Sequence, residues 1–365
     1  MGCTSVMAHV GLLLMSGLFL SSRVQARKWH DTGVGSIAFE EAWSPPQLIH
    51  QADFTVPPVG QTLADLENNL LDIHNQRLAH MDANNMDFMV LSCASPCIQA
   101  ITDPANASAT ATAINDLLAA DIANSTERFG AFAALAMHDP AVAAAELRRA
   151  VTELGFLGAL INDYQQAGTP DNQTFIFYDQ PEFDVFWQTV VDLDVPVYLH
   201  PRVNPPPVST LLFEHARFLI GPAQEFASTL STHVLGLCTN GVFDRFPNLT
   251  LIIGHLGERL PSDLVRIDDQ LARQVAAGMP MQKNVTFYFQ HNILETTSGN
   301  FATDLVKFHA AQIGLERILY SVDYPYVTME QGAAWLDNEV PKFLTHEQAL
   351  ALKRGRAIEV LRLNR

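Results

Sequence analysis

The sequence has few basic residues and few cysteines. Its 365 residues carry 22 Lys and Arg against 39 Asp and Glu, which gives a formal net charge of −17. Nucleic acids and anionic membranes are bound through clustered Lys and Arg, and no basic run is present, so we expect neither as a partner. Because the 4 cysteines are too few for a disulfide framework, a hydrophobic core must stabilise the fold.

One long apolar run is present, and it lies at the N-terminus. Residues 6–20 are rich in Leu and Met and are followed by Val24-Gln25-Ala26, a tripeptide similar to signal-peptidase sites. We expect a signal peptide over residues 1–26 and a single mature domain over residues 27–365, without a membrane segment after cleavage. An uncleaved anchor stays open, because residues 1–6 lack the usual basic residue.

The remainder of the chain carries further signs of secretion. Five N-x-Ser/Thr sequons begin at Asn106, Asn124, Asn172, Asn248 and Asn284. N-glycosylation takes place in a secretory lumen, so the sequence predicts a glycoprotein that is secreted or held in the secretory pathway. The spacing of Cys93 and Cys97 around Ser95-Pro96 leaves open whether these two cysteines are paired.

Short β-rich runs alternate with helical runs along the whole domain. The candidate strands are Ser36–Glu41, Phe88–Cys93, Phe129–Leu135, Gly158–Asp163, Pro196–Pro201, Leu251–His255, Ile293–Ser298 and Ile318–Asp323. Most are continuously apolar, as strands buried on both faces of a parallel sheet are. Eight such units predict a (β/α)8 barrel. A doubly wound sheet is the alternative, but no G-x-G-x-x-G or Walker loop follows any strand.

Two helices have recognisable beginnings. Asp139-Pro140 is an N-cap followed by a proline in the first helical position, and Gly155 closes that Ala-rich helix. Thr345 and Gln348 form the pattern of a capping box that opens the last helix.

Polar residues end four of the eight expected strands, at the edge where barrels carry their chemistry. They are Glu40, His200, His255 with Glu258, and Asp323. Taken singly, each has a structural explanation, such as a helix cap or a core histidine. Their common placement favours a site, and carboxylates with imidazoles suit a divalent ion.

The segments around these residues resemble four signatures of the amidohydrolase-related decarboxylases. The segments are Ile37–Trp43, Val197–Arg202, Ile253–Glu258 and Tyr320–Pro325. The family includes 2,3-dihydroxybenzoate, γ-resorcylate, salicylate and 6-methylsalicylate decarboxylases and the aminocarboxymuconate semialdehyde decarboxylases. The resemblance runs from about Gly35 to Arg365, and the ordered set is specific although no single segment is.

The resemblance implies a barrel with one divalent metal ion, bound by Glu40, His200 and Asp323. We expect Zn²⁺, with Mn²⁺ and Mg²⁺ left open. Ala42 departs from the E-x-H pattern that many members have on the first strand. The decarboxylases with E-E-A-F are more similar to this chain, and in them water fills the vacant position.

The resemblance also implies an activity, the non-oxidative decarboxylation of an ortho-hydroxy aromatic acid to the phenol and CO2. Candidate substrates are 6-methylsalicylate, orsellinate and dihydroxybenzoates. Direct loss of CO2 would leave an unstabilised aryl carbanion, so the ring carbon must be protonated first, and Asp323 is the implied donor. His255 and Glu258 resemble the family's His–Glu pair, which hydrogen-bonds a substrate oxygen.

Four further residues are candidates for substrate binding. Arg266 matches an arginine that in relatives reaches the site of the neighbouring subunit, which implies a homodimer or homotetramer; an exposed helix arginine is the other interpretation. Arg202 and Arg266 would make the mouth of an acidic protein locally positive. Trp43 and Tyr326 are either aromatic walls of the site or core residues.

Two other functions remain open from the sequence. The first is a mononuclear metal-dependent hydrolase or lactonase on the same barrel; a binuclear hydrolase is disfavoured, because it needs H-x-H where this chain has Glu40-Glu41-Ala42. The second is a non-catalytic secreted glycoprotein that keeps the barrel as a binding scaffold.

Overall fold

The structure is a computed structural model that describes residues 29–364, apart from residues 52–55, 170–171 and 207. The signal peptide expected over residues 1–26 lies outside the described residues. Within the described chain, no helix combines the length and the apolar composition needed to cross a membrane.

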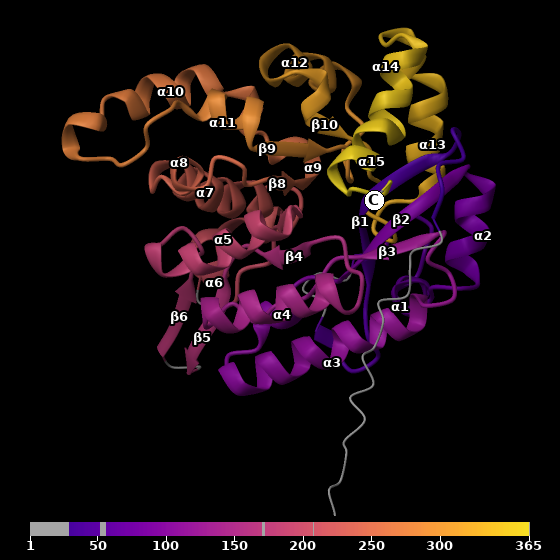
Figure 1. Cartoon of the computed structure of the whole chain (residues 1–365), viewed down its shortest axis with the longest axis horizontal. Helices are drawn as coiled ribbons and strands as arrows, with labels where there is room; N and C mark the ends of the chain where they lie inside the picture. The colour runs from indigo at the N-terminus through magenta and orange to yellow at the C-terminus, as the bar shows by residue number, and fades with distance from the viewer. Residues whose placement is uncertain (1–28, 52–55, 170–171, 207, 365) are drawn as a thin grey trace, which may run out of the picture.

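Parallel strands form the centre of the molecule (Figure 1). They are β1 (Ser36–Trp43), β2 (Met86–Cys93), β3 (Phe129–Ala131), β4 (Ala159–Asn162), β7 (Val197–His200), β8 (Leu251–Ile253), β9 (Ile293–Thr296) and β10 (Ile318–Leu319). β1, β2 and β3 pair in that order, as do β4, β7, β8, β9 and β10. Ala133 bridges to Ala159, and the Ala42 amide donates to the Tyr324 carbonyl at 2.8 Å. These two links join the sheets into a closed ring, which confirms the (β/α)8 barrel.

Each expected strand coincides with an observed one, but several are shorter than expected, above all the third, which ends at Ala131, and the last. β10 ends at Leu319, because the Ser321 amide donates to Thr297 Oγ1 and the Val322 amide to Glu41 Oε1 instead of continuing the ladder. The antiparallel hairpin of β5 (Gln165–Thr169) and β6 (Asn172–Ile176) was not predicted. Its strands are polar and largely outside the core, so they lack the apolar signal of a buried strand.

Helices surround the barrel. They are α1 (Leu63–Leu71), α2 (Gln76–Ala83), α3 (Pro104–Ile122), α4 (Pro140–Thr152), α5 (Asp184–Leu193), α6 (Val208–Phe213), α7 (Glu225–Thr239), α8 (Val242–Arg245), α9 (Gly254–Gly257), α10 (Leu264–Ala272), α11 (Val285–His291), α12 (Thr303–Ile313), α13 (Met329–Asn338), α14 (His346–Leu350) and α15 (Arg356–Val360). The Asp139 side chain caps α4 and the capping box of Thr345 opens α14, as predicted.

Alternate strand residues divide the core in two. A large cluster joins strand residues such as Val197 and Leu199 to the surrounding helices. A second cluster gathers Phe39, Tyr198 and Ile252 with residues from the other strands, and therefore lies inside the ring. The polar residues at the carboxyl ends of the strands lie directly above this interior layer.

Candidate active site

Three side chains from separate strand ends meet at the carboxyl end of the barrel. Glu40 Oε1 lies 3.0 Å from His200 Nε2 and 3.1 Å from His255 Nε2. Asp323 stands next to them, with Oδ2 3.8 Å from His255 Nε2. Glu40 comes from β1, His200 from the last residue of β7, and the other two from the turns that follow β8 and β10.

An extra residue in β1 sets the direction of Glu40. Ala38 is paired with Met89 and Glu41 with Leu91, so β1 contains one more residue than β2 between these two pairs. Such a bulge interrupts the alternation of side chains, so that neighbouring residues no longer face opposite sides of the sheet regularly. The amides of Phe39 and Glu40 both donate to Ser321 Oγ, at 3.2 and 2.9 Å.

The second oxygen of the Glu40 carboxylate is held from below. The fully buried Tyr198 hydroxyl donates to Glu40 Oε2 and also lies 2.8 Å from Thr296 Oγ1. Tyr198 was not among the site residues predicted from the sequence. The signal was present, because Tyr198 lies two residues before His200 on the same strand and therefore on the same face.

The residues present fit a divalent cation. Glu40 Oε1 is buried and has no hydrogen-bond partner, although two imidazole nitrogens approach it. One ligand atom each from Glu40, His200 and His255 can be chosen so that all lie within 4.8 Å of one another. An oxygen and two nitrogens at this spacing suit a divalent metal ion. Asp323, the expected third ligand, stands beside this trio, next to His255.

Burial and mutual charge shift the pKa values of the cluster in opposite directions. Burial alone would raise the pKa of Glu40, but the charges of His255 and His200 outweigh it and hold the pKa below its usual range. Burial would lower the pKa of His255, but Glu40 and Glu258 raise it well above its usual range. For Asp323, burial and the negative charge of Glu40 raise the pKa well above its usual range. A bound cation would instead lower the pKa of Asp323.

The turn after β8 orients His255. His255 and Glu258 adopt left-handed backbone conformations, with φ of 56° and 47°, which non-glycine residues seldom do. This turn brings Glu258 Oε1 to 2.6 Å from His255 Nδ1. The carboxylate therefore favours the proton on Nδ1 and leaves Nε2 directed at Glu40 and Asp323.

Glu41 holds the turn that carries Asp323. Its carboxylate accepts hydrogen bonds from Ser321 Oγ, the Val322 amide and the Tyr324 amide, each at 2.9 Å. Asp323 itself has a φ of 78°, so its backbone conformation depends on this support. From the sequence, Glu41 was only part of a motif and had no predicted role.

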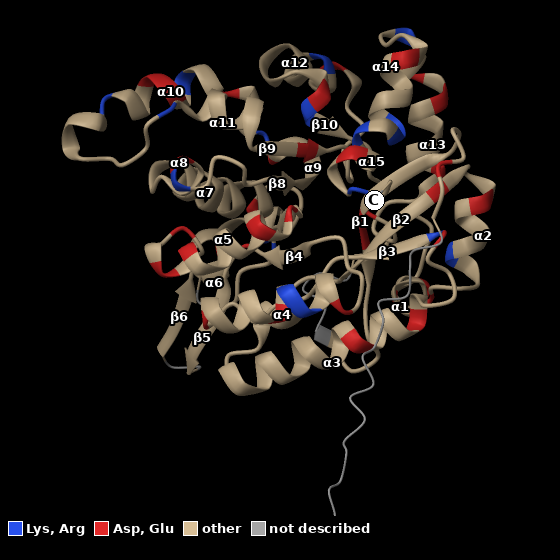
Figure 2. Cartoon of the chain, viewed as in Figure 1, with Lys and Arg blue, Asp and Glu red and all other residues tan. Residues whose placement is uncertain are grey.

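The cluster opens into a cavity of about 380 Å³. His255, Glu258 and Asp323 supply polar wall, while Phe226 and Tyr326 supply aromatic wall. This volume and this mixture suit a small aromatic acid. Asp and Glu are otherwise spread over the outer helices (Figure 2), so most of the net negative charge belongs to the outside of the barrel.

The other expected substrate-binding residues lie apart from this cavity. The buried guanidinium of Arg202 donates to Gln99 O and Gln166 Oε1, both at 2.9 Å, and lines a different cavity. Trp43 is buried in the core that packs against the helices, and Arg266 is exposed on α10. Tyr326 lines the catalytic cavity. Arg259 was not predicted from the sequence, and it is the one Lys or Arg among the described residues that line this cavity.

A closed (β/α)8 barrel with a buried carboxylate–imidazole cluster at its carboxyl end defines a metal-dependent barrel enzyme. The amidohydrolase family model matches residues 68–363, and the chain belongs to this family. The chain is 38% identical over 333 residues to the γ-resorcylate decarboxylase of Rhodococcus jostii, covering 91% of this chain and 99% of that protein.

Solved structures give the same result. A 2,6-dihydroxybenzoate decarboxylase in complex with 2,6-dihydroxybenzoate superimposes with a TM-score of 0.84 at 37% identity, covering 90% of this chain and 99% of that one. A dihydroxybenzoic acid decarboxylase from Polaromonas, with bound manganese and the inhibitor 2-nitroresorcinol, has the same TM-score and identity and covers 91% of this chain and 98% of that one. The resemblance to the amidohydrolase-related decarboxylases is therefore confirmed, and a divalent metal is supported.

Proposed function

We propose that the protein decarboxylates an ortho-hydroxy aromatic acid of the 2,6-dihydroxybenzoate type to the corresponding phenol and CO2, without net oxidation. The observation that carries this proposal is Asp323 at the wall of the cavity, beside the Glu40–His200–His255 cluster. The chain is similar over nine-tenths of its length to an enzyme crystallised with that acid.

The mechanism follows from what each side chain can do. Glu40, His200 and Asp323 would hold a divalent ion, which would supply Lewis acidity when bound. Asp323 gives its proton to the ring carbon that bears the carboxylate, forming a C–H bond. The bond from that carbon to the carboxylate then breaks, its electron pair restores the aromatic ring, and CO2 leaves. Solvent returns a proton to Asp323, while His255, oriented by Glu258, hydrogen-bonds a substrate oxygen.

Product analysis tests this function. Purified protein incubated with 2,6-dihydroxybenzoate, 6-methylsalicylate and orsellinate should release CO2 and the phenol in equal amounts. A hydrolase or lactonase would instead form acid from an ester or lactone without gas. Turnover of a lactone panel together with an absence of CO2 from every aromatic acid would refute the proposal.

We propose Zn²⁺ as the physiological ion, with Mn²⁺ as the alternative. The imidazole of His200 among the proposed ligands favours these ions over Mg²⁺, which prefers oxygen ligands. Elemental analysis of protein purified without added metal identifies the ion. Comparing metal affinity in Asp323→Asn and His255→Asn tests the ligand set. The variant that lacks a true ligand should lose more metal affinity than the variant that lacks only a neighbouring side chain.

We further propose that the enzyme is a homo-oligomer in which Arg266 reaches the partner's cavity. Exposed apolar side chains support an interface: Leu211 on α6, Phe218 beyond it, and Val265 next to Arg266 on α10 are 80%, 82% and 77% exposed. Exposed apolar side chains that gather into one contiguous patch are typical of surfaces that associate.

A mixing experiment tests this arrangement. Arg266→Ala and Asp323→Asn subunits should each be inactive alone. After subunit exchange, the cavity of an Arg266→Ala subunit would receive Arg266 from its partner, so activity should return. If mixing restores nothing while light scattering shows mixed oligomers, Arg266 does not act across the interface.

Secretion remains our proposal for the location of the protein. All five sequon asparagines are exposed, and Cys93 and Cys97 form a disulfide, which is rare in reducing compartments. Expression in the native host should place the protein in the medium or lumen, lacking residues 1–26 and shifted in mass by glycosidase. Recovery of full-length, unglycosylated protein from the cytosol would contradict this.

A further inference from the structure

His200 is held in place from the side opposite the metal cluster. Its Nε2 faces Glu40, while its Nδ1 lies 2.6 Å from the Pro201 carbonyl and 3.3 Å from Asn162 Oδ1. Both neighbours are acceptors, so the ring carries its proton on Nδ1. The lone pair of Nε2 is then free for a cation, which is the usual role of such a partner behind a metal-binding histidine.

Asn162, the last residue of β4, is itself fixed by the segment that follows β2. It is buried, with 1% exposure. Its Nδ2 donates to the Pro96 carbonyl at 3.1 Å and to Gln99 Oε1 at 3.2 Å. These bonds decide which way the amide faces, so that Oδ1 is the atom presented to His200.

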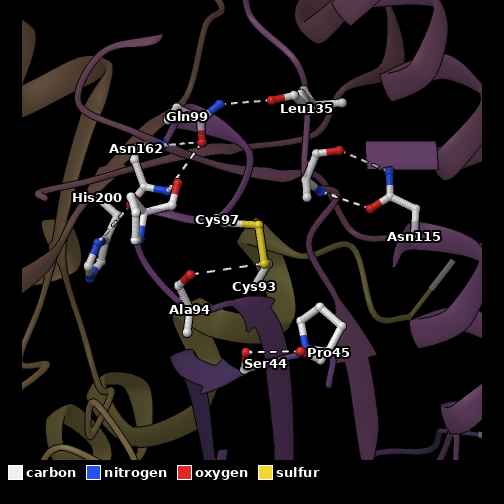
Figure 3. The surroundings of a disulfide bond; sticks show 12 residues. Ser44, Pro45, Cys93, Ala94, Cys97, Gln99, Asn115, Leu135, Asn162 and His200 are labelled. Atoms are coloured by element: carbon white, nitrogen blue, oxygen red, sulfur yellow. Dashed lines mark hydrogen bonds between the residues drawn. A yellow bond between two sulfur atoms is a disulfide. The ribbon is translucent and has the colours of Figure 1, made fainter. Parts of the chain in front are cut away.

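The Cys93–Cys97 disulfide closes this segment (Figure 3). The bond joins the end of β2 to the residues that supply the partners of Asn162. Ser95, inside the closed loop, donates from Oγ to the Pro201 carbonyl at 3.2 Å. The disulfide loop therefore reaches His200 twice, once through Asn162 and once through Pro201.

We propose that Asn162 is a positioning residue for His200, and that the Cys93–Cys97 disulfide keeps Asn162 in register, so that divalent-metal affinity depends on this bond. A dithiol reductant that passes two electrons to the disulfide would leave two thiols, an oxidised dithiol and a loosened loop. The inference rests on the metal site of the proposed function. Metal binding would then require Asn162 and the disulfide in addition to the ligands themselves.

Metal affinity and thermal stability, measured together, test the proposal. Asn162→Ala should weaken Zn²⁺ and Mn²⁺ binding, measured by chelator competition, by about 10- to 100-fold. Asn115→Ala is the matched control: Asn115 is equally buried and bonds Ala134 and Glu146 on the other side of the loop. It should lower the melting temperature of the metal-free protein without changing metal affinity. A loss of affinity in Asn162→Ala no larger than in Asn115→Ala overturns the proposal.

The disulfide is tested without relying on reductant access. The Cys93→Ala/Cys97→Ala variant should bind metal at least tenfold more weakly, whereas Cys238→Ala, which removes a buried unpaired cysteine, should not. Adding Asn162→Ala to the cysteine pair should cost little more than Asn162→Ala alone. Fully additive losses, or wild-type affinity in the cysteine pair, would refute the link. If the wild-type protein itself binds no metal, the proposed function fails instead.

Discussion

Replacing Gly254 by Ala should disable the metal cluster through a single methyl group. A Cβ at this position would stand 2.9 Å from Tyr198 Oη and 3.2 Å from Glu40 Cδ, and closer still to Glu40 Oε2. Ordinary contacts begin near 3.4 Å, and the Gly254 backbone is not in the left-handed region, so the methyl group itself is the perturbation. Because Glu40 Oε2 would be the nearest atom to the added methyl group, the carboxylate is the group that must retreat.

The magnitude follows from how little displacement a metal site tolerates. The carboxylate has to move by about 1 Å, whereas ligand distances must hold to within about 0.2 Å. Ligand misplacement on this scale costs about 100-fold in rate. We therefore expect Gly254→Ala to lose about 100-fold in kcat/KM and to retain far less than one equivalent of metal by elemental analysis.

The matched control is Gly355→Ala, where a Cβ would meet nothing closer than 3.8 Å. That variant should keep its metal and activity, because the added methyl group meets no close neighbour. It should be no less stable than the wild type, because alanine is preferred to glycine in a helix by about 1 kcal/mol. Circular dichroism should show both variants folded. A Gly254→Ala protein with full metal content and wild-type kcat/KM would refute the role of Glu40 as a ligand.

Three further perturbations test the chemistry and the architecture. Asp323→Asn should lower kcat by about 10²- to 10⁴-fold, the usual contribution of a general acid, while metal binding stays measurable; full turnover would remove Asp323 from the mechanism. Glu41→Gln should cost about 1–3 kcal/mol in the free energy of unfolding, measured by denaturant titration, because its new amide cannot accept every bond that Ser321, Val322 and Tyr324 offer. An unchanged unfolding curve would contradict that support. Stripping metal with a chelator should abolish activity and lower the melting temperature, and metal returned at about 100 times its Kd should restore about 2.7 kcal/mol; a melting temperature indifferent to metal would argue against a resident ion.

The strands and the convergence of the site could be predicted because both have local signals. Runs such as residues 88–91 are apolar throughout, and parallel strands buried on both faces require this. Parallel strands in a barrel also place their carboxyl ends together, so Glu40, His200, His255 and Asp323 were candidates from position alone.

The remaining details depend on contacts between distant residues. Period-2 alternation assumes a regular strand, so the extra residue in β1 could not be anticipated, and with it the different surroundings of Glu40 and Glu41. Arg202 lies two residues after His200 of the motif, but its guanidinium donates hydrogen bonds to Gln99 and Gln166, which are distant in sequence. Cys93 and Cys97 could be paired only once the chain between them was seen to turn back.

The first and last strands of the barrel meet at the active site, and this has a consequence for how the molecule folds. The bond from the Tyr324 amide to Glu41 spans 283 residues. Closing a loop of that length costs about 2 kcal/mol more entropy than closing one βα unit of some 30 residues. Contacts of such long range form slowly, so ring closure belongs late in folding. A molecule whose last strand has not docked has no turn to present Asp323 beside Glu40. The metal-to-protein ratio of a preparation therefore also reports the fraction of molecules that completed the ring.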